Sequence, residues 1–181
     1  GADRAIHIEA EDPGAYDPLE AARLMAAALR AEAPDLVLTG LQSDDLGYGQ
    51  TGPILAELLG LPHATLIMEV DKHEGGIRVK RELEDGWFQH VEMPLPALLT
   101  IQSGISKLRY ATLMGIKRAK TKEVRRLTPA ELGGGGESAA SIHLDRVYLP
   151  QHAKHTQLFE GNPQEAAAQL VEKLRFEARV I

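Results

Sequence analysis

The sequence predicts an α/β protein with a doubly wound, mostly parallel sheet, an antiparallel hairpin at one sheet edge and an extended C-terminal arm. Two observations support this fold class. Short apolar runs alternate with helical patterns over residues 5–70, and two segments of period-two alternation then flank an Asp-Gly turn. The 181 residues are 44% hydrophobic and 25% charged, which is the range of ordinary globular proteins.

The first part of the chain has the order β-α-β-α-β. Residues 5–9 alternate apolar and polar side chains, which predicts a short strand. Asp17-Pro18 supplies an N-cap and a proline at the first helical position, and residues 19–33 are good helix formers. The apolar run Asp35-Leu-Val-Leu-Thr-Gly40 predicts a buried parallel strand. A helix over 50–60 and a strand over 64–70 complete this part.

An antiparallel hairpin is predicted next. Residues 77–83 and 86–93 alternate with period two around Glu84-Asp85-Gly86, a strong hairpin signal. Residues 73–76 form a second turn, and 97–102 return to an apolar strand.

Beyond Arg109 the pattern weakens. Residues 112–120 predict a short helix, four glycines at 133–136 predict a flexible linker, and 142–149 predict a strand. Asn162-Pro163 caps a final helix over 163–176. The chain from about residue 124 onward is interpreted as an arm that requires a partner surface.

Composition excludes several functions. The net charge of −6 disfavours a general nucleic-acid binder, and the absence of cysteine excludes disulfides and thiolate metal sites. No signal peptide is visible, and no apolar run is long enough to span a bilayer.

The loop from Gly40 to Gly52 is the main candidate site. It joins the carboxyl end of a predicted strand to a helix start, where free amides and the helix dipole favour an anion. Gly49 and Gly52 permit close approach of the backbone, and Gln50 and Thr51 add polar side chains. Because no lysine lies in the loop, a monophosphate or diphosphate fits better than a hydrolysed triphosphate.

The alternative, purely structural interpretation of this loop is that its glycines only permit tight turns. Asp44 and Asp45 are interpreted as solvated or capping residues, because adjacent carboxylates seldom converge on one ion. His152 and His155 are three apart, but no carboxylate or cysteine accompanies them, so no metal site is assigned.

Four blocks in order resemble electron-transfer flavoprotein beta subunits. They are Gly1-Ala-Asp-Arg-Ala-Ile-His-Ile-Glu9, Asp35–Gly40 followed by Gln50-Thr51-Gly52, Leu95-Pro96-Ala97, and Arg109-Tyr-Ala-Thr-Leu113. The resemblance implies the adenine nucleotide alpha-hydrolase-like fold. It implies a nucleotide-binding domain over 1–123, with a docking loop at 100–122, and an arm over 124–181 that packs on the partner subunit.

The resemblance also implies the function. Such a chain forms a heterodimer with an alpha subunit that carries most of the FAD, and it holds a structural AMP itself. Electrons pass from acyl-CoA and related dehydrogenases of fatty acid beta-oxidation to a flavoprotein-quinone oxidoreductase. The chain is then an electron carrier without catalytic residues, not embedded in the membrane, and located in the bacterial cytoplasm or the mitochondrial matrix.

Two sets of site residues follow from the resemblance. The AMP set comprises Gly40, Leu41, Gln42, Ser43, Asp44, Asp45, Gly49, Gln50, Thr51 and Gly52. The docking set comprises Arg109, Tyr110, Leu113, Met114 and Ile116, with Leu113 as the anchor. Without the resemblance, Leu113 is better interpreted as the core residue of an amphipathic helix. The six basic residues within 117–126 are either a solvated face or a surface that steers an acidic partner.

The sequence departs from the family at its start. Family members have roughly a further half-domain before the Gly-Ala-Asp-Arg block, which places nucleotide binding by this chain alone in doubt. Alternatives therefore stay open: a universal-stress-type nucleotide-binding module, an adenylyl-transfer enzyme, or an electron-bifurcating flavoprotein subunit with FAD in place of AMP. The adenylyl-transfer enzyme is disfavoured because residues 41–52 contain no Lys or His.

Overall fold

The computed structural model describes residues 1–12, 16–133, 142, 145–149 and 156–181. The chain divides into two compact units, Gly1–His143 and Leu144–Ile181. The first unit contains β1 (Arg4–Ile8), α1 (Pro18–Arg30), β2 (Leu36–Gly40), α2 (Thr51–Leu59), β3 (His63–His73), β4 (Gly76–Glu82), η2 (Glu84–Gly86), β5 (Phe88–Met93), β6 (Ala97–Ile101), α3 (Leu113–Ala119), β7 (Glu123–Leu127) and η3 (Ala130–Leu132). The second contains α4 (Pro163–Phe176).

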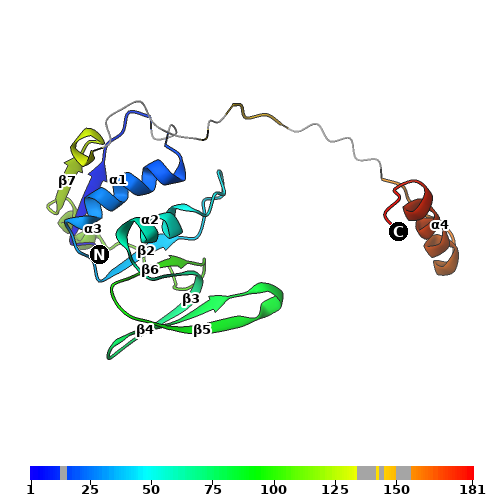
Figure 1. Cartoon of the computed structure of the whole chain (residues 1–181), viewed down its shortest axis with the longest axis horizontal. Coiled ribbons are helices and arrows are strands. Elements are labelled where there is room, and N and C mark those ends of the chain that lie inside the picture. The colour runs from blue at the N-terminus through cyan, green and yellow to red at the C-terminus, as the bar shows by residue number, and fades with distance from the viewer. Residues whose placement is uncertain (13–15, 134–141, 143–144, 150–155) are drawn as a thin grey trace. The chain divides into compact units, whose positions relative to one another are not determined.

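The main sheet combines parallel strands with an antiparallel hairpin at one edge, as predicted. Its five strands have the order β2-β6-β3-β4-β5. Strand β6 runs parallel to both β2 and β3, whereas β4 is antiparallel to β3 and β5. The antiparallel strands form the long hairpin at the far side of the sheet from β2 (Figure 1). At its turn Asp85 and Gly86 both have positive φ, 56° and 76°, which is the conformation that Asp-Gly pairs favour.

Strand β1 does not join this sheet, contrary to the pattern expected from a regular β-α-β-α-β unit. It pairs in parallel with β7, from Arg4 opposite Glu123 to Ile8 opposite Leu127. Glu32, just beyond α1, forms ion pairs with Arg4 and Arg125 and so connects both strands to the helix. The start of the predicted arm, residues 124–127, therefore lies within the first unit.

Both long helices of the first unit cover one face of the main sheet. Ala22 and Ala26 of α1 and Leu55 and Ala56 of α2 are buried against Leu98 of β6. Figure 1 shows α1 and α2 together on this side of the sheet. The small alanines allow the helices to lie close together, and the aliphatic side chains supply the hydrophobic burial.

The opposite face has its own core. Ile67, Ile77, Val79 and Leu99 are 0–2% exposed and come from β3, β4 and β6. Their alternation with residues of the helix-covered face, such as Leu98 beside Leu99, follows from the period-two geometry of a strand.

The helix starts follow local capping chemistry. Asp17 Oδ1 accepts a hydrogen bond from the Glu20 amide at 2.9 Å, with Pro18 in the first turn, as the sequence predicts. Asn162 and Glu165 form a capping box at the start of α4, whose bounds match the predicted helix.

One predicted strand is wrong. In the part of 142–149 that the structure describes, namely 142 and 145–149, no residue is in a strand. Alternating side chains do not suffice, because a strand also needs a partner for its backbone groups. His152, His155 and three of the four linker glycines, residues 134–136, lie outside the described residues.

The close contact of Gly52 in α2 with Thr39 of β2 and Thr100 of β6, here called the seam, gives a first prediction. A Cβ placed on Gly52 would lie 2.6 Å from Thr39 Oγ1 and 2.6 Å from Thr100 Cγ2. Gly52→Ala should therefore lower the free energy of unfolding by about 1–3 kcal/mol through overpacking, measured by urea denaturation. Gly40→Ala is the matched control, since a Cβ there meets nothing within 4 Å. Equal stability of the two variants would contradict the tight seam.

Candidate functional site

A hollow of about 430 Å³ opens between the starts of α1 and α2 and the end of β2. Eight of the predicted AMP residues line it: Gly40, Leu41, Gln42, Ser43, Gly49, Gln50, Thr51 and Gly52. The hollow is within the size range of small-molecule sites, roughly 300–1,000 Å³. The loop and helix start that the sequence singled out thus surround one concave surface.

The N-terminus of α2 at this hollow is uncapped. Gln50 occupies the N-cap position and makes no side-chain hydrogen bond, and the first turn contains no acidic residue. Within the described residues, the amides of Thr51 and Gly52 have no acceptor. The other described α-helices are capped by the side chains of Asp17, Thr112 and Asn162. The start of α2 therefore retains donors and a positive dipole end for an anion.

Thr39 adds an unsatisfied polar group to the same wall. Its Oγ1 is buried and has no hydrogen-bond partner among the described residues. The residue lies at the end of β2 and lines the hollow beside Gly52. A buried hydroxyl without a partner is costly unless it is later satisfied.

The two aspartates of the loop do not line the hollow. Asp45 Oδ1 accepts a hydrogen bond from the Leu46 amide at 2.7 Å. The Ser43 hydroxyl and this backbone donor lower the pKa of Asp45 below its ordinary value. Asp45 therefore stabilises the turn, in keeping with the capping role expected from the sequence. No cluster of three potential metal ligands occurs in the described residues.

The sequence analysis missed about half of the lining. The additional residues are Tyr16, Asp17, Pro18, Ala21, Met25, Thr39, Leu46 and Tyr48. The available signal was the Asp17-Pro18 helix start, because helices that follow parallel strands begin at the same sheet edge. The two tyrosines, Met25 and Leu46 make part of the wall apolar or aromatic, in addition to the polar start of α2.

The predicted docking residues form an exposed segment. Tyr110, Leu113 and Met114 are 88%, 86% and 60% exposed, and Ile116 and Arg109 are exposed as well. Thr112 caps α3 by accepting a hydrogen bond from the Gly115 amide at 3.0 Å. No residue of α3 is buried in the described part of the chain, so Leu113 is not the core residue of an amphipathic helix here.

Comparison with known proteins identifies the family. Residues 1–132 match the family described as electron transfer flavoprotein domain. The chain is 36% identical over 180 residues to the electron transfer flavoprotein subunit beta of Methylophilus methylotrophus, covering 95% of this chain and 67% of that protein. It is 33% identical to the Bacillus subtilis (strain 168) subunit beta, covering 100% and 71%, and 33% identical to the mitochondrial subunit beta of Oryza sativa subsp. japonica, covering 100% and 69%.

The chain belongs to the electron transfer flavoprotein beta-subunit family. It spans about two thirds of the length of these relatives. In the described residues no helix combines the length and apolar character of a bilayer span.

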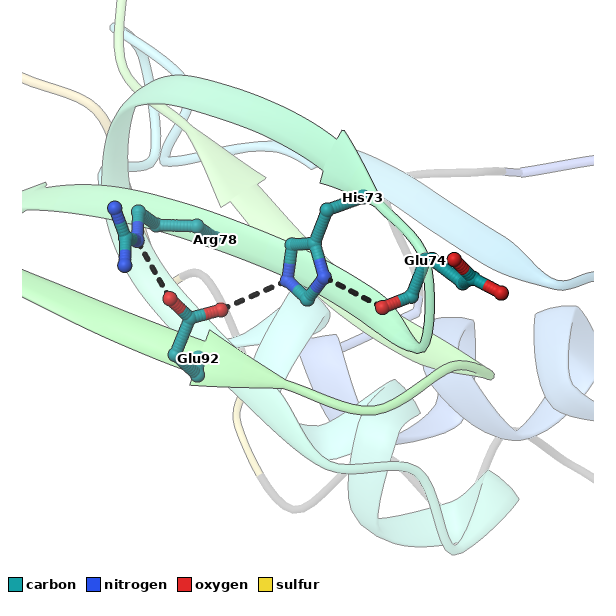
Figure 2. A network of polar contacts seen from close by, with 4 residues as sticks. All are labelled: His73, Glu74, Arg78 and Glu92. Atoms are coloured by element: carbon teal, nitrogen blue, oxygen red, sulfur yellow. Dashed lines mark hydrogen bonds and ion pairs between the residues drawn. The ribbon is translucent and has the colours of Figure 1, made fainter.

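A second polar cluster lies on the antiparallel strands β3, β4 and β5 (Figure 2) and shares no residue with the hollow. His73 Nδ1 donates to the Glu74 carbonyl at 2.9 Å, and Nε2 lies 2.8 Å from Glu92 Oε2. Glu92 also accepts from Arg78 Nε. The Glu74 carbonyl and the Glu92 carboxylate raise the pKa of His73, and Arg78 with His73 lowers the pKa of Glu92.

This cluster gives a pH prediction. The pKa of His73 is higher in the folded protein than in the unfolded chain, where it is about 6.5. Protonated His73 therefore stabilises the hairpin fully below pH 6.5, and this stabilisation is lost as the pH rises through the pKa of His73 in the folded protein. Glu92→Gln should shift the His73 titration, measured by NMR, to lower pH. An unchanged midpoint would contradict the pairing.

Proposed function

We propose that this chain is the beta subunit of a heterodimeric electron-transfer flavoprotein that holds a structural AMP. Electrons from flavoprotein dehydrogenases, including acyl-CoA dehydrogenases, reach FAD held mainly by the alpha subunit and continue to a quinone oxidoreductase. Membership of the family and the hollow at the uncapped start of α2 support this proposal. The proposed compartment is the bacterial cytoplasm or the mitochondrial matrix.

The residues of the hollow fit a nucleoside monophosphate. The free amides of Thr51 and Gly52 suit a phosphate, which gains from both the donors and the helix dipole. The buried Thr39 hydroxyl offers a further polar partner at the same wall. Tyr16 and Met25, which line the same hollow, offer apolar surface for a base.

This chain binds and positions rather than catalyses. FAD supplies the redox chemistry when it is bound. The residues 41–52 contain no Lys or His to move a proton or to stabilise a terminal phosphate. The role of the chain is to hold the nucleotide as a structural element and to present a surface to other proteins.

Docking is assigned to the exposed segment around Leu113. A leucine that is 86% exposed on a seven-residue helix has no structural function in the described part of the chain. Inserted into an apolar pocket of a dehydrogenase, it would act as an interface anchor surrounded by weaker contacts.

The nucleotide content of the purified heterodimer tests the proposal. Acid release and chromatography should yield one AMP and one FAD per heterodimer. Two FAD and no AMP would replace the proposal with an electron-bifurcating flavoprotein. A colourless homodimer that releases ATP would instead indicate a universal-stress-type module.

The docking role has its own test. Leu113→Ala should weaken the productive complex with a reduced acyl-CoA dehydrogenase by about tenfold to thirtyfold, the effect of removing a hot spot of ~1.5–2 kcal/mol. The flavin absorbance spectrum should not change. Leu113→Met, which keeps a long apolar side chain, is the control and should retain most of the activity. Wild-type kinetics for Leu113→Ala would refute the anchor.

A further inference from the structure

Three antiparallel strands of the main sheet end at the same place. Strand β3 ends at His73, β4 begins at Gly76 and β5 ends at Met93. In the register of the sheet, His73 lies opposite Gly76 and Ile77 lies opposite Met93. Ile77 and Met93 are 2% and 7% exposed and belong to the core of this face. Because a sheet opens most easily at its strand ends, the contacts at this end determine how well this part of the core is closed.

A series of polar contacts joins these strand ends. Arg78 of β4 lies directly opposite Glu92 of β5, and its Nε donates to Glu92 Oε1. The other carboxylate oxygen, Oε2, lies 2.8 Å from His73 Nε2. Since β4 lies between β3 and β5, this second contact connects two strands that are not neighbours. Figure 2 shows the His73 ring between Glu92 and the carbonyl of Glu74, and these four residues are here called the clamp.

Both nitrogens of the His73 ring face atoms that can only accept a hydrogen bond. Nδ1 lies 2.9 Å from the Glu74 carbonyl, and Nε2 faces a carboxylate whose pKa is lowered by Arg78 and by His73 itself. A carbonyl and an ionised carboxylate supply no hydrogen, so both contacts are hydrogen bonds only when both ring nitrogens carry one. In the neutral ring, one nitrogen lone pair faces an oxygen instead. The complete clamp therefore contains an imidazolium cation.

Solvent and neighbouring charges both reach this ring. A hollow of about 370 Å³ is lined by His73 together with Asp71 of β3, Arg78 of β4 and Glu92 of β5. The carboxylate of Glu74 points away from the ring (Figure 2). Two of the three charged side chains beside His73 are anionic, which favours the protonated ring. The side chains of His73 and Glu92 are 47% and 53% exposed, so the ring exchanges its proton with water.

We propose that the clamp is a proton-dependent switch: protonated His73 holds the β3–β4 turn against the end of β5, and loss of its proton lets this end of the sheet open locally. The Glu74 carbonyl and the Glu92 carboxylate raise the pKa of His73 above its ordinary value of about 6.5. The clamp is therefore complete below pH 6.5 and is lost as the pH rises through the pKa of His73 in the folded protein. The inference is independent of the nucleotide and docking roles proposed above.

The opening should be confined to the strand ends. Strand β6 lies beyond β3, between β3 and β2, and its residues 97–100 are buried between the two cores. None of these residues belongs to the clamp. The change is therefore expected at residues 72–78 and 91–93 and not in β6.

The test is hydrogen–deuterium exchange of the complete protein, resolved to peptides by mass spectrometry. Rates are converted to protection factors, which removes the effect of pH on the intrinsic exchange rate. They are compared at about pH 5.5 and at one pH unit above the pKa of His73 measured by NMR titration. His73→Gln removes the titrating group from the clamp. The matched control His90→Gln removes an exposed histidine of β5 that lies outside the clamp.

In the wild type, protection of residues 72–78 and 91–93 should be about twofold to fivefold lower at the higher pH, the effect of losing an exposed ion pair. His73→Gln should show the lower protection at both pH values, and His90→Gln should behave as the wild type. Equal wild-type protection at the two pH values would overturn the inference. So would a wild-type pH dependence in His73→Gln, or a loss of protection that extends equally to β6.

Discussion

The close packing of α1 and α2 on the face of β2 and β6 determines where the hollow lies. Ala22, Ala26 and Ala56 are at most 1% exposed, and Gly52 touches the strands where any side chain would clash. With larger residues at this seam, the helices would stand further from the sheet and from each other. The two helix starts would then no longer border one concave surface at the end of β2.

The elements that the sequence predicted well are those with local causes. Asp17-Pro18, Asn162-Pro163 and Asp85-Gly86 each specify a cap or a turn through residues that are adjacent in the chain. The apolar runs at 35–40 and 97–102 likewise specify strands, and 97–102 gives the buried strand β6. Residues 35–40 were expected to be buried as well, but β2 lies at the edge of the sheet, where only Val37 is buried and Leu38 is 58% exposed. The pairing of β1 with β7 was not predicted, because nothing near residues 4–8 indicates a partner more than a hundred positions later. The strand predicted at 142–149 is absent from its described residues, because an alternating pattern indicates a strand without showing that a second strand is there to pair with it.

In the candidate site, too, the residues that are contiguous in the sequence were predicted and those brought together by packing were not. The loop from Gly40 to Gly52 was recognisable because glycines, polar residues and a helix start are contiguous there. Tyr16 and Met25 were not, because they reach the hollow only through the packing of α1 on α2. Whether a basic side chain forms an ion pair within the chain also depends on residues that are distant in the sequence. Lys120 and Lys122 look alike in the sequence, yet Lys122 lies beside Asp3, and Lys120 has no ion-pair partner among the described residues.

The pairing of β1 with β7 also affects the order in which the chain can fold during its synthesis. Residues 4–8 leave the ribosome well before their partner strand, which ends at Leu127. At about 5–20 residues per second, β1 waits on the order of ten seconds without its backbone partners. Helices and hairpins form far faster than this. The main sheet and its two helices can therefore assemble while the chain is still growing, whereas the β1–β7 ribbon can close only after Leu127 has emerged.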